Sequence, residues 1–138
     1  MSSNVRNFPD LKFELTGKII GAAIEVHKHL GPGLLESVYE ACLFQEIKQL
    51  GLHVEKQKIL PVTYKDLVIE QGFRLDLFVE NKIIIELKAV EEFLPIHRAQ
   101  VISYMRLSQS PLGLLINFNK KVLKDGIQRF ALTEFEGI

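Results

Sequence analysis

Three charged residues, Asp76, Glu86 and Lys88, stand in two neighbouring segments whose alternating pattern is typical of β-strands. Two carboxylates at neighbouring positions of a sheet repel each other unless a cation lies between them or one is protonated. Mg²⁺ suits such an all-oxygen site, and Mn²⁺ can substitute for it, because the ion keeps several waters and leaves room for a phosphate. The ammonium of Lys88 could then stabilise charge on that phosphate or orient an attacking water. These residue types point to metal-dependent chemistry on a phosphate ester.

This chemistry requires one particular pairing of the two segments. If residues 80–82 form a three-residue hairpin loop, Asp76 lies directly across from Glu86 on the same face of the sheet. A two-residue loop would set Asp76 opposite Leu87 instead. Alternation along the first segment also places Arg74 on the face of Asp76. The opposite, apolar face is expected to comprise Phe73, Leu75, Leu77 and Val79.

A polar helix face is expected to lie beside the charged strands. Gln100 and Tyr104 are four residues apart in a segment of helical period over 93–107, so they share a face, with His97 one turn earlier. A helix that follows the third strand could lay this face along the charged face of the sheet. Two simpler interpretations stay open. The charged strand residues could form ion pairs on a solvated face, and Gln100 and Tyr104 could be boundary residues with solvent-facing polar ends.

The order of secondary-structure elements follows from hydrophobic periodicity. Helical spacing predicts helices over 16–30 and 35–50, separated by a Gly-Pro-Gly break. Strand patterns follow, in which Pro61 indicates an edge position and Gly72 a bulge. Further strands and one helix are predicted over 59–64, 67–79, 83–89, 93–107, 112–118 and 128–132. We therefore expect an α/β (mixed α+β) fold whose central sheet is flanked by helices and begins as an antiparallel meander.

Four short motifs stand on these elements in a fixed order. They are Gly33-Leu-Leu-Glu36-Ser-Val-Tyr39, Gly72-Phe-Arg74-Leu-Asp76, Glu86-Leu-Lys88 and Gln100-x-x-x-Tyr104. The last three resemble the motif series of PD-(D/E)XK nucleases of the RecB and lambda exonuclease kind. The first resembles the signature of the GxxExxY proteins, a small bacterial and archaeal family assigned to that superfamily. The similarity covers residues 16–132 and implies a restriction-endonuclease-like αβββαβ core with an extra N-terminal helix.

The resemblance also implies a role for each matching residue. Asp76 and Glu86 would hold Mg²⁺, with Glu36 as an added ligand, and Lys88 would assist attack by a Mg²⁺-activated water on a phosphodiester bond of DNA or, second, RNA. Contacts with DNA ends or backbone would involve the Gln-Tyr pair. The residues assigned to catalysis in this way are Asp76, Glu86, Lys88, Glu36, Gln100 and Tyr104. Tyr39 continues the apolar stripe of its helix, so we interpret it as a core residue.

Basic side chains that could contact the phosphate backbone lie near these motifs. They are Arg74, Arg98, Arg106, Lys120 and Lys121, with Lys124 nearby, although a solvated surface explains them almost as well. The chain has 17 Lys plus Arg and 17 Asp plus Glu, so no global positive field favours nucleic-acid binding. An alternative function is therefore a non-catalytic binding or regulatory module that keeps the nuclease fold, as a homodimer or a subunit of a larger complex.

Length and composition set the remaining expectations. A chain of 138 residues is long enough for one domain over 1–138 and too short for two ordinary ones. The one cysteine, Cys42, has no partner for an internal disulfide and is expected to be a small core residue. The N-terminal residues lack an apolar run of signal-peptide length, and no run approaches the roughly 18 apolar residues of a membrane span. We expect a cytoplasmic protein with no membrane partner.

Overall fold

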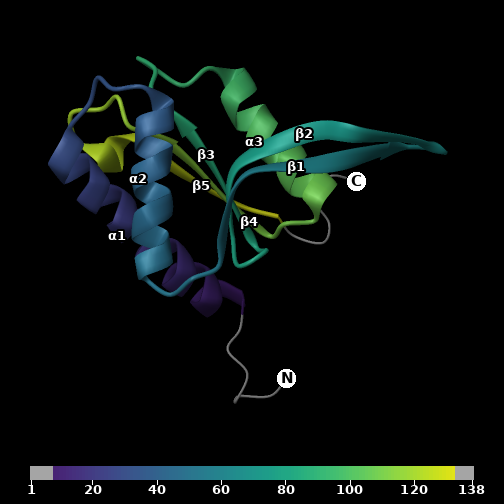
Figure 1. Ribbon diagram of the computed structural model, residues 1–138, viewed down its shortest axis with the longest axis horizontal. Coiled ribbons are helices and arrows are strands. Elements are labelled where there is room, and N and C mark those ends of the chain that lie inside the picture. Colours follow the sequence, from purple (N-terminus) through teal and green to yellow (C-terminus); the bar gives the residue numbers. More distant parts are fainter. Residues whose placement is uncertain (1–7, 133–138) are drawn as a thin grey trace.

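The order of elements matches the one expected from periodicity. The computed structural model describes the backbone of residues 8–132 and the side chains of residues 14–132 (Figure 1). Its elements are α1 (Phe8–Leu30), α2 (Glu36–Gln49), β1 (Val54–Tyr64), β2 (Leu67–Val79), β3 (Ile83–Lys88), α3 (Pro95–Ser108), β4 (Leu112–Asn117), the short 3₁₀ helix η1 (Leu123–Gly126) and β5 (Ile127–Ala131). None of the helices in this part of the chain is long and apolar enough to cross a membrane.

A five-stranded mixed sheet forms the centre of the fold. Its strands lie in the order β1-β2-β3-β4-β5, and every neighbouring pair is antiparallel except β3 and β4, which are parallel. A parallel pair needs a crossover connection, and α3 provides it. Because helices cover both faces of this sheet, β3 and β4 are nearly continuous apolar runs. The three-strand meander and the short edge strand at the C-terminal side are both confirmed.

Two clusters of buried side chains fill the space on the two sides of the sheet. One joins α1 and α2 to the sheet through residues such as Ile19, Leu43, Leu77, Ile85 and Ile116. The other lies beneath α3 and is built from Phe73, Leu75, Phe78, Ile84, Val101, Met105 and Leu115. Figure 1 shows the same arrangement, with α1 and α2 together on one side and α3 on the other. The ends of β2 and β3 are thus held from both sides.

The expectation that β2 has one continuous apolar face is wrong. Leu77 and Val79 pack with α1 and α2, whereas Phe73 and Leu75 pack beneath α3. In a regular strand these four residues would share a face, since side chains alternate with a period of two. The strand therefore changes faces between Leu75 and Leu77, and the residue at the crossing point is Asp76.

The physical reason lies in the neighbouring strand, at Gln57. Its backbone has φ 51°, in the left-handed region, which no regular strand residue adopts. The pairs on either side of it, Lys56 with Leu77 and Lys58 with Leu75, are regular. Both strands therefore rotate between these two pairs. Side chains that would share a face in a regular strand lie on opposite faces on the two sides of this point.

Beyond this level β1 and β2 continue as a two-stranded hairpin that extends away from the rest of the sheet (Figure 1). The register between the strands shifts between Leu60 and Val62, opposite Gly72, which confirms the predicted bulge and the edge position of Pro61. A Cβ at Gly72 would lie 2.4 Å from Cγ2 of Val62, so the two strands approach closely only because a glycine is there.

Candidate active site

The hairpin between β2 and β3 has the register that the chemistry requires. Val79 pairs with Ile83 across a three-residue loop, and the pairing continues to Leu77 with Ile85. The next level brings Asp76 opposite Glu86. The predicted odd-length loop is therefore what the structure has, and both carboxylates stand at the point where the regular ladder between the strands ends.

Asp76 and Glu86 replace the backbone ladder with their own side chains. The backbone N–H of Asp76 donates to Oε2 of Glu86 at 3.1 Å, and the backbone N–H of Leu87 donates to Oδ2 of Asp76 at 2.9 Å. Each carboxylate thus bonds the opposite strand, which keeps the strands apart while fixing both side chains. Reciprocal hydrogen bonds thus hold the two acidic side chains at the point where the ladder between β2 and β3 ends.

Burial dominates the electrostatics of this pair. It raises the pKa of Asp76, and the charge of Glu36 raises it further. Burial, followed by the charge of Asp76, raises the pKa of Glu86 to about 8. Lys88 and the backbone hydrogen bonds oppose both shifts without cancelling them. Within residues 14–132 no ion pair within 4.0 Å includes either carboxylate or Lys88, so negative charge at this site lacks a close partner.

The turn before α2 is locked by Tyr39. Gly31 and Gly33 have φ of 68° and 102°, which glycine adopts without strain. The hydroxyl of Tyr39 donates to the carbonyl oxygen of Gly31 at 2.6 Å and accepts from the N–H of Leu34 at 3.1 Å. Its ring is fully buried and stacks on Phe118 with centroids 4.5 Å apart. The tyrosine is a core residue, as its position in the apolar stripe predicted.

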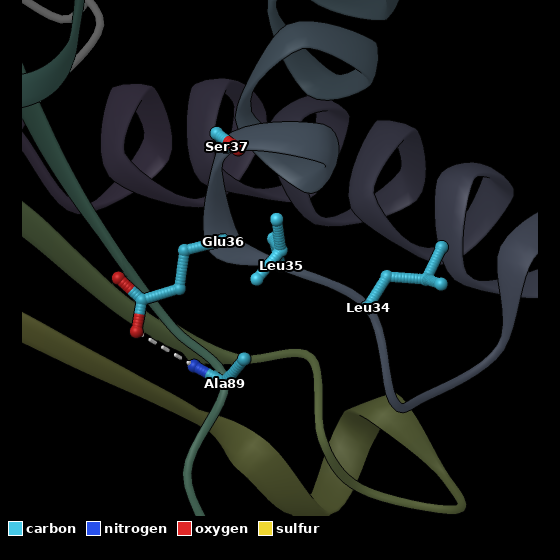
Figure 2. A pocket seen from close by; sticks show the side chains of 5 residues that line it. All are labelled: Leu34, Leu35, Glu36, Ser37 and Ala89. Carbon is cyan, nitrogen blue, oxygen red and sulfur yellow. Dashed lines mark hydrogen bonds between the residues drawn. The ribbon is translucent and has the colours of Figure 1, made fainter.

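Glu36 begins α2 directly after this turn, and its carboxylate points towards the end of β3. Its Oε2 accepts a hydrogen bond from the N–H of Ala89 at 3.1 Å, as Figure 2 shows. An open pocket of about 400 Å³ lies here, lined also by Leu34, Leu35 and Ser37. The side chain therefore reaches the residue that follows Lys88, and its charge acts on Asp76.

Tyr39→Phe should lower the free energy of unfolding by about 1–2 kcal/mol, because it leaves the carbonyl of the half-buried Gly31 and the N–H of Leu34 without their partner. Urea unfolding followed by circular dichroism measures this difference. Tyr64→Phe is the matched control, since Tyr64 is 61% exposed and should change stability by less than about 0.5 kcal/mol. Equal stability of the two variants would show that the hydroxyl of Tyr39 does not hold the turn.

A fourth carboxylate, Glu40, belongs to the same region and was missed in the sequence. It lies one turn beyond Glu36 on α2, and Nε2 of Gln57 donates to its Oε1 at 2.5 Å. Burial raises its pKa, and the charge of Asp76 raises it further, while Arg74 lowers it. Glu40 in turn contributes to the raised pKa of Glu86. The four-residue spacing from Glu36 was the signal that could have revealed it.

Gln100 and Tyr104 share a face of α3, as expected. Nε2 of Gln100 donates to the hydroxyl of Tyr104 at 3.0 Å, and the ring of Tyr104 stacks on Phe73 with centroids 4.8 Å apart. The pair therefore lies along β2 at Phe73, on the strand that carries Asp76. Within the described part of the chain, neither side chain hydrogen-bonds to the carboxylates or to Lys88. His97 instead accepts from the N–H of Leu94 and closes the start of α3.

The predicted basic residues have different surroundings. Arg74 is exposed and close enough to lower the pKa of Asp76. The guanidinium of Arg98 packs 5.9 Å from the ring centroid of Phe130, and Arg106 and Lys121 are exposed. Nζ of Lys120 donates to Oε1 of Glu92 at 2.9 Å and to the carbonyl oxygen of Glu91, so this lysine holds the loop after β3. Of these residues, Arg74 is the one beside the carboxylates.

Asn117 is a second residue that sequence reasoning missed. It is fully buried at the end of β4 and pairs with Lys88 in the parallel ladder. Its Nδ2 donates to the carbonyl oxygen of Val90 at 2.7 Å, and its Oδ1 accepts from the N–H of the same residue at 3.1 Å. This two-way bond fixes the chain that leaves β3, and with it the end of the strand that carries Lys88.

The side chains of the candidate site are of the kind that binds a divalent cation, but too few of them converge on one point. Asp76 and Glu86 offer oxygen atoms, and burial disfavours their charged forms unless a cation such as Mg²⁺ or Mn²⁺ offsets the negative charge. Within the described residues no three His, Cys, Asp or Glu side chains converge as a ready-made metal site. Glu36, the expected third ligand, bonds Ala89 instead. The two central residues fit the ion, and a third ligand would have to move towards it.

Comparison with known proteins identifies the superfamily of the chain. The sequence profile of the PD-(D/E)XK nuclease superfamily matches residues 13–130. No curated protein matches the chain. A solved structure titled "Crystal structure of SSO0001" is similar at 22% identity with a TM-score of 0.49, covering 72% of this chain and 50% of that one. The chain thus spans about half the length of that protein.

Proposed function

This chain belongs to the PD-(D/E)XK nuclease superfamily, and we propose that it is a metal-dependent nuclease that hydrolyses phosphodiester bonds, with DNA as the expected substrate. The restriction-endonuclease-like fold expected from the sequence is confirmed. The observation that supports the proposal most is the reciprocal bonding of Asp76 and Glu86 at the end of the hairpin. This arrangement keeps two carboxylates together in a partly buried site, where binding of a divalent cation would offset their negative charge. Assignment to the GxxExxY family stays a prediction.

Each residue of the candidate site would have its own role in the reaction. Asp76 and Glu86 would hold Mg²⁺ or Mn²⁺, with Glu36 as the ligand that joins them. When bound, such an ion supplies Lewis-acid chemistry and offsets charge that develops on a phosphate. Lys88 stands two residues beyond Glu86, and its ammonium would stabilise the negative charge of the transition state or orient the attacking water. Gln100 and Tyr104 would contact the backbone of the substrate.

The nucleic acid would lie across the end of the sheet. Arg74 is exposed next to Asp76, so it is the basic residue best placed to contact a phosphate beside the scissile one. Arg106 and Lys121 are exposed as well and would contact other phosphates of the backbone. Lys120 and Arg98 are already engaged by Glu92 and Phe130, so we expect smaller effects from their removal.

Purified protein should cleave single-stranded or double-stranded DNA, or RNA, when Mg²⁺ or Mn²⁺ is present, and EDTA should abolish the cleavage. Gel assays with end-labelled substrates of all three kinds measure this and separate cutting at ends from internal cutting. Asp76→Asn removes the charge that holds the ion, so it should reduce cleavage by at least about 10²-fold. Glu46→Gln, on an outlying part of α2, is the control with unchanged activity. Cleavage that persists in EDTA, or no cleavage of any substrate, contradicts the proposal.

The β1–β2 hairpin supports a second candidate function, that of a binding module. Its side chains Ile59, Tyr64, Leu67, Val68 and Ile69 are between 46% and 61% exposed. A two-stranded hairpin with apolar residues in solvent is marginally stable alone, and such surfaces often contact another protein. Sedimentation-velocity measurements together with calorimetric titration with Mn²⁺ separate the two functions. A stable homodimer with no divalent-cation binding would favour the module over the nuclease.

A further inference from the structure

Gln57 has a conformation that nothing in its local sequence requires. The other non-glycine residues with positive φ in the described chain lie in turns or at a helix end, where this conformation is common: Lys65, Glu80, Asn81 and Gln109. Gln57 lies inside a strand, with regular pairs on both sides. The left-handed conformation is unfavourable for a residue that bears a Cβ. A glycine would adopt it freely, so the glutamine side chain needs an explanation.

The side chain of Gln57 connects β1 to α2 at the level of the candidate site. The flanking pairs, Lys56 with Leu77 and Lys58 with Leu75, place Gln57 across from Asp76. Its amide Nε2 donates to Oε1 of Glu40 at 2.5 Å. The unusual backbone therefore does two things at one level of the sheet. It turns the strands so that Asp76 can face β3, and it directs an amide at the carboxylate of Glu40.

We propose that Gln57 and Glu40 are positioning residues of the cation site, with Gln57 holding the Glu40 carboxylate on the α2 side of Asp76 and Glu86. This inference rests on the proposed function and adds to it a fourth carboxylate that no family motif assigns. The amide of Gln57 donates to the carboxylate, so it favours the charged form and fixes its direction. Glu40 would then attract a divalent cation and order its outer waters, which are the usual tasks of groups around a metal site.

A purely structural role for Gln57 makes a different prediction. If the residue only turned the strands, glycine would serve better, and replacing the glutamine would leave cation binding unchanged. If the residue positions Glu40, Gln57→Gly should relieve the backbone strain yet weaken the site. The two properties, stability and cation affinity, should therefore change in opposite directions in this one variant.

The test is titration of the purified chain with Mn²⁺, followed by calorimetry and by the electron paramagnetic resonance of the free ion. Glu40→Gln should weaken Mn²⁺ binding by about 10-fold, the lower end of the effects typical of groups around a metal. Gln57→Gly should weaken it by about 3-fold or more, with an equal or higher melting temperature. Glu46→Gln lies on the same helix and should bind Mn²⁺ as the parent does. Asp76→Asn should abolish binding.

Each outcome decides between the claims. If Asp76→Asn loses Mn²⁺ while Glu40→Gln and Gln57→Gly bind it as tightly as the parent, the positioning role is overturned and the proposed function stands. If the parent binds no Mn²⁺, the proposed function fails and this inference fails with it. A lower melting temperature of Gln57→Gly would show that the glutamine serves the fold, which also overturns the positioning role.

Discussion

Lys88→Ala should reduce cleavage of nucleic acid by about 10²–10³-fold while Mn²⁺ stays bound. Removing one group that stabilises charge in a transition state typically has an effect of this size. Lys88 is half-buried at the end of β3 and forms no ion pair within 4.0 Å among the described residues, so its removal breaks no such pair. Its charge lowers the pKa of both neighbouring carboxylates. Without it, the affinity for a cation should stay equal or rise.

The readouts are single-turnover cleavage and Mn²⁺ titration on the same preparations. Lys28→Ala is the matched control, because Lys28 is an exposed lysine at the end of α1, a helix from which no residue is assigned to the site. Full activity of Lys88→Ala would remove the lysine from the mechanism. Loss of activity together with loss of Mn²⁺ binding would mean that the residue supports the carboxylates instead of the reaction.

The metal-free protein should lose stability as the pH rises from about 4.5 towards 8. Burial and the charge of Asp76 raise the pKa of Glu86 from its ordinary 4.5 to about 8, so the folded chain holds this proton more tightly than the unfolded chain does. The stabilisation is complete below the unfolded pKa and is lost as the pH passes through the folded one. At 1.36 kcal/mol per pKa unit, the loss is roughly 3–5 kcal/mol. The raised pKa of Asp76 acts in the same direction.

Glu86→Gln should remove most of this pH dependence, since a neutral amide keeps the shape of the protonated acid. In EDTA at pH 8 the variant should be more stable than the parent by roughly 2–4 kcal/mol, measured by urea unfolding. Mn²⁺ should stabilise the parent at pH 8 and leave Glu86→Gln unchanged, because the cation replaces the proton. Equal stability of parent and variant at pH 5 and pH 8 would contradict the raised pKa of Glu86.

Much of the fold could be predicted because its signals are local. Helical periodicity located α1, α2 and α3, and Gly72 marked the bulge where a Cβ has no room beside Val62. The three-residue loop at 80–82 was a geometric requirement of the expected chemistry, and the pairing of its flanking residues confirms it. The predicted alternation of faces along β2 was wrong at the level where one residue of β1 leaves the strand conformation. Nothing about Gln57 in the sequence indicates a positive φ, so the change of faces at Asp76 could not be foreseen.

The part of the candidate site that depends on local sequence could be predicted, and the rest could not. The two central carboxylates are adjacent across a hairpin, so a short-range pattern reveals them. Glu40 and Asn117 act through contacts between distant segments, with Gln57 and with Val90, and only the packed fold brings these together. The surroundings of the basic residues also depend on contacts between distant segments. Lys120 is engaged by Glu92, a partner that sequence spacing does not indicate.

The most direct test is a crystal structure of the chain soaked in Mn²⁺, with diffraction recorded at a wavelength where manganese scatters anomalously. We expect an anomalous difference peak in contact with the carboxylates of both Asp76 and Glu86, and no such peak in crystals of Asp76→Asn. The absence of a peak between these two residues in the parent, or a peak that persists in Asp76→Asn, would contradict the assignment of this hairpin as a metal-dependent nuclease site.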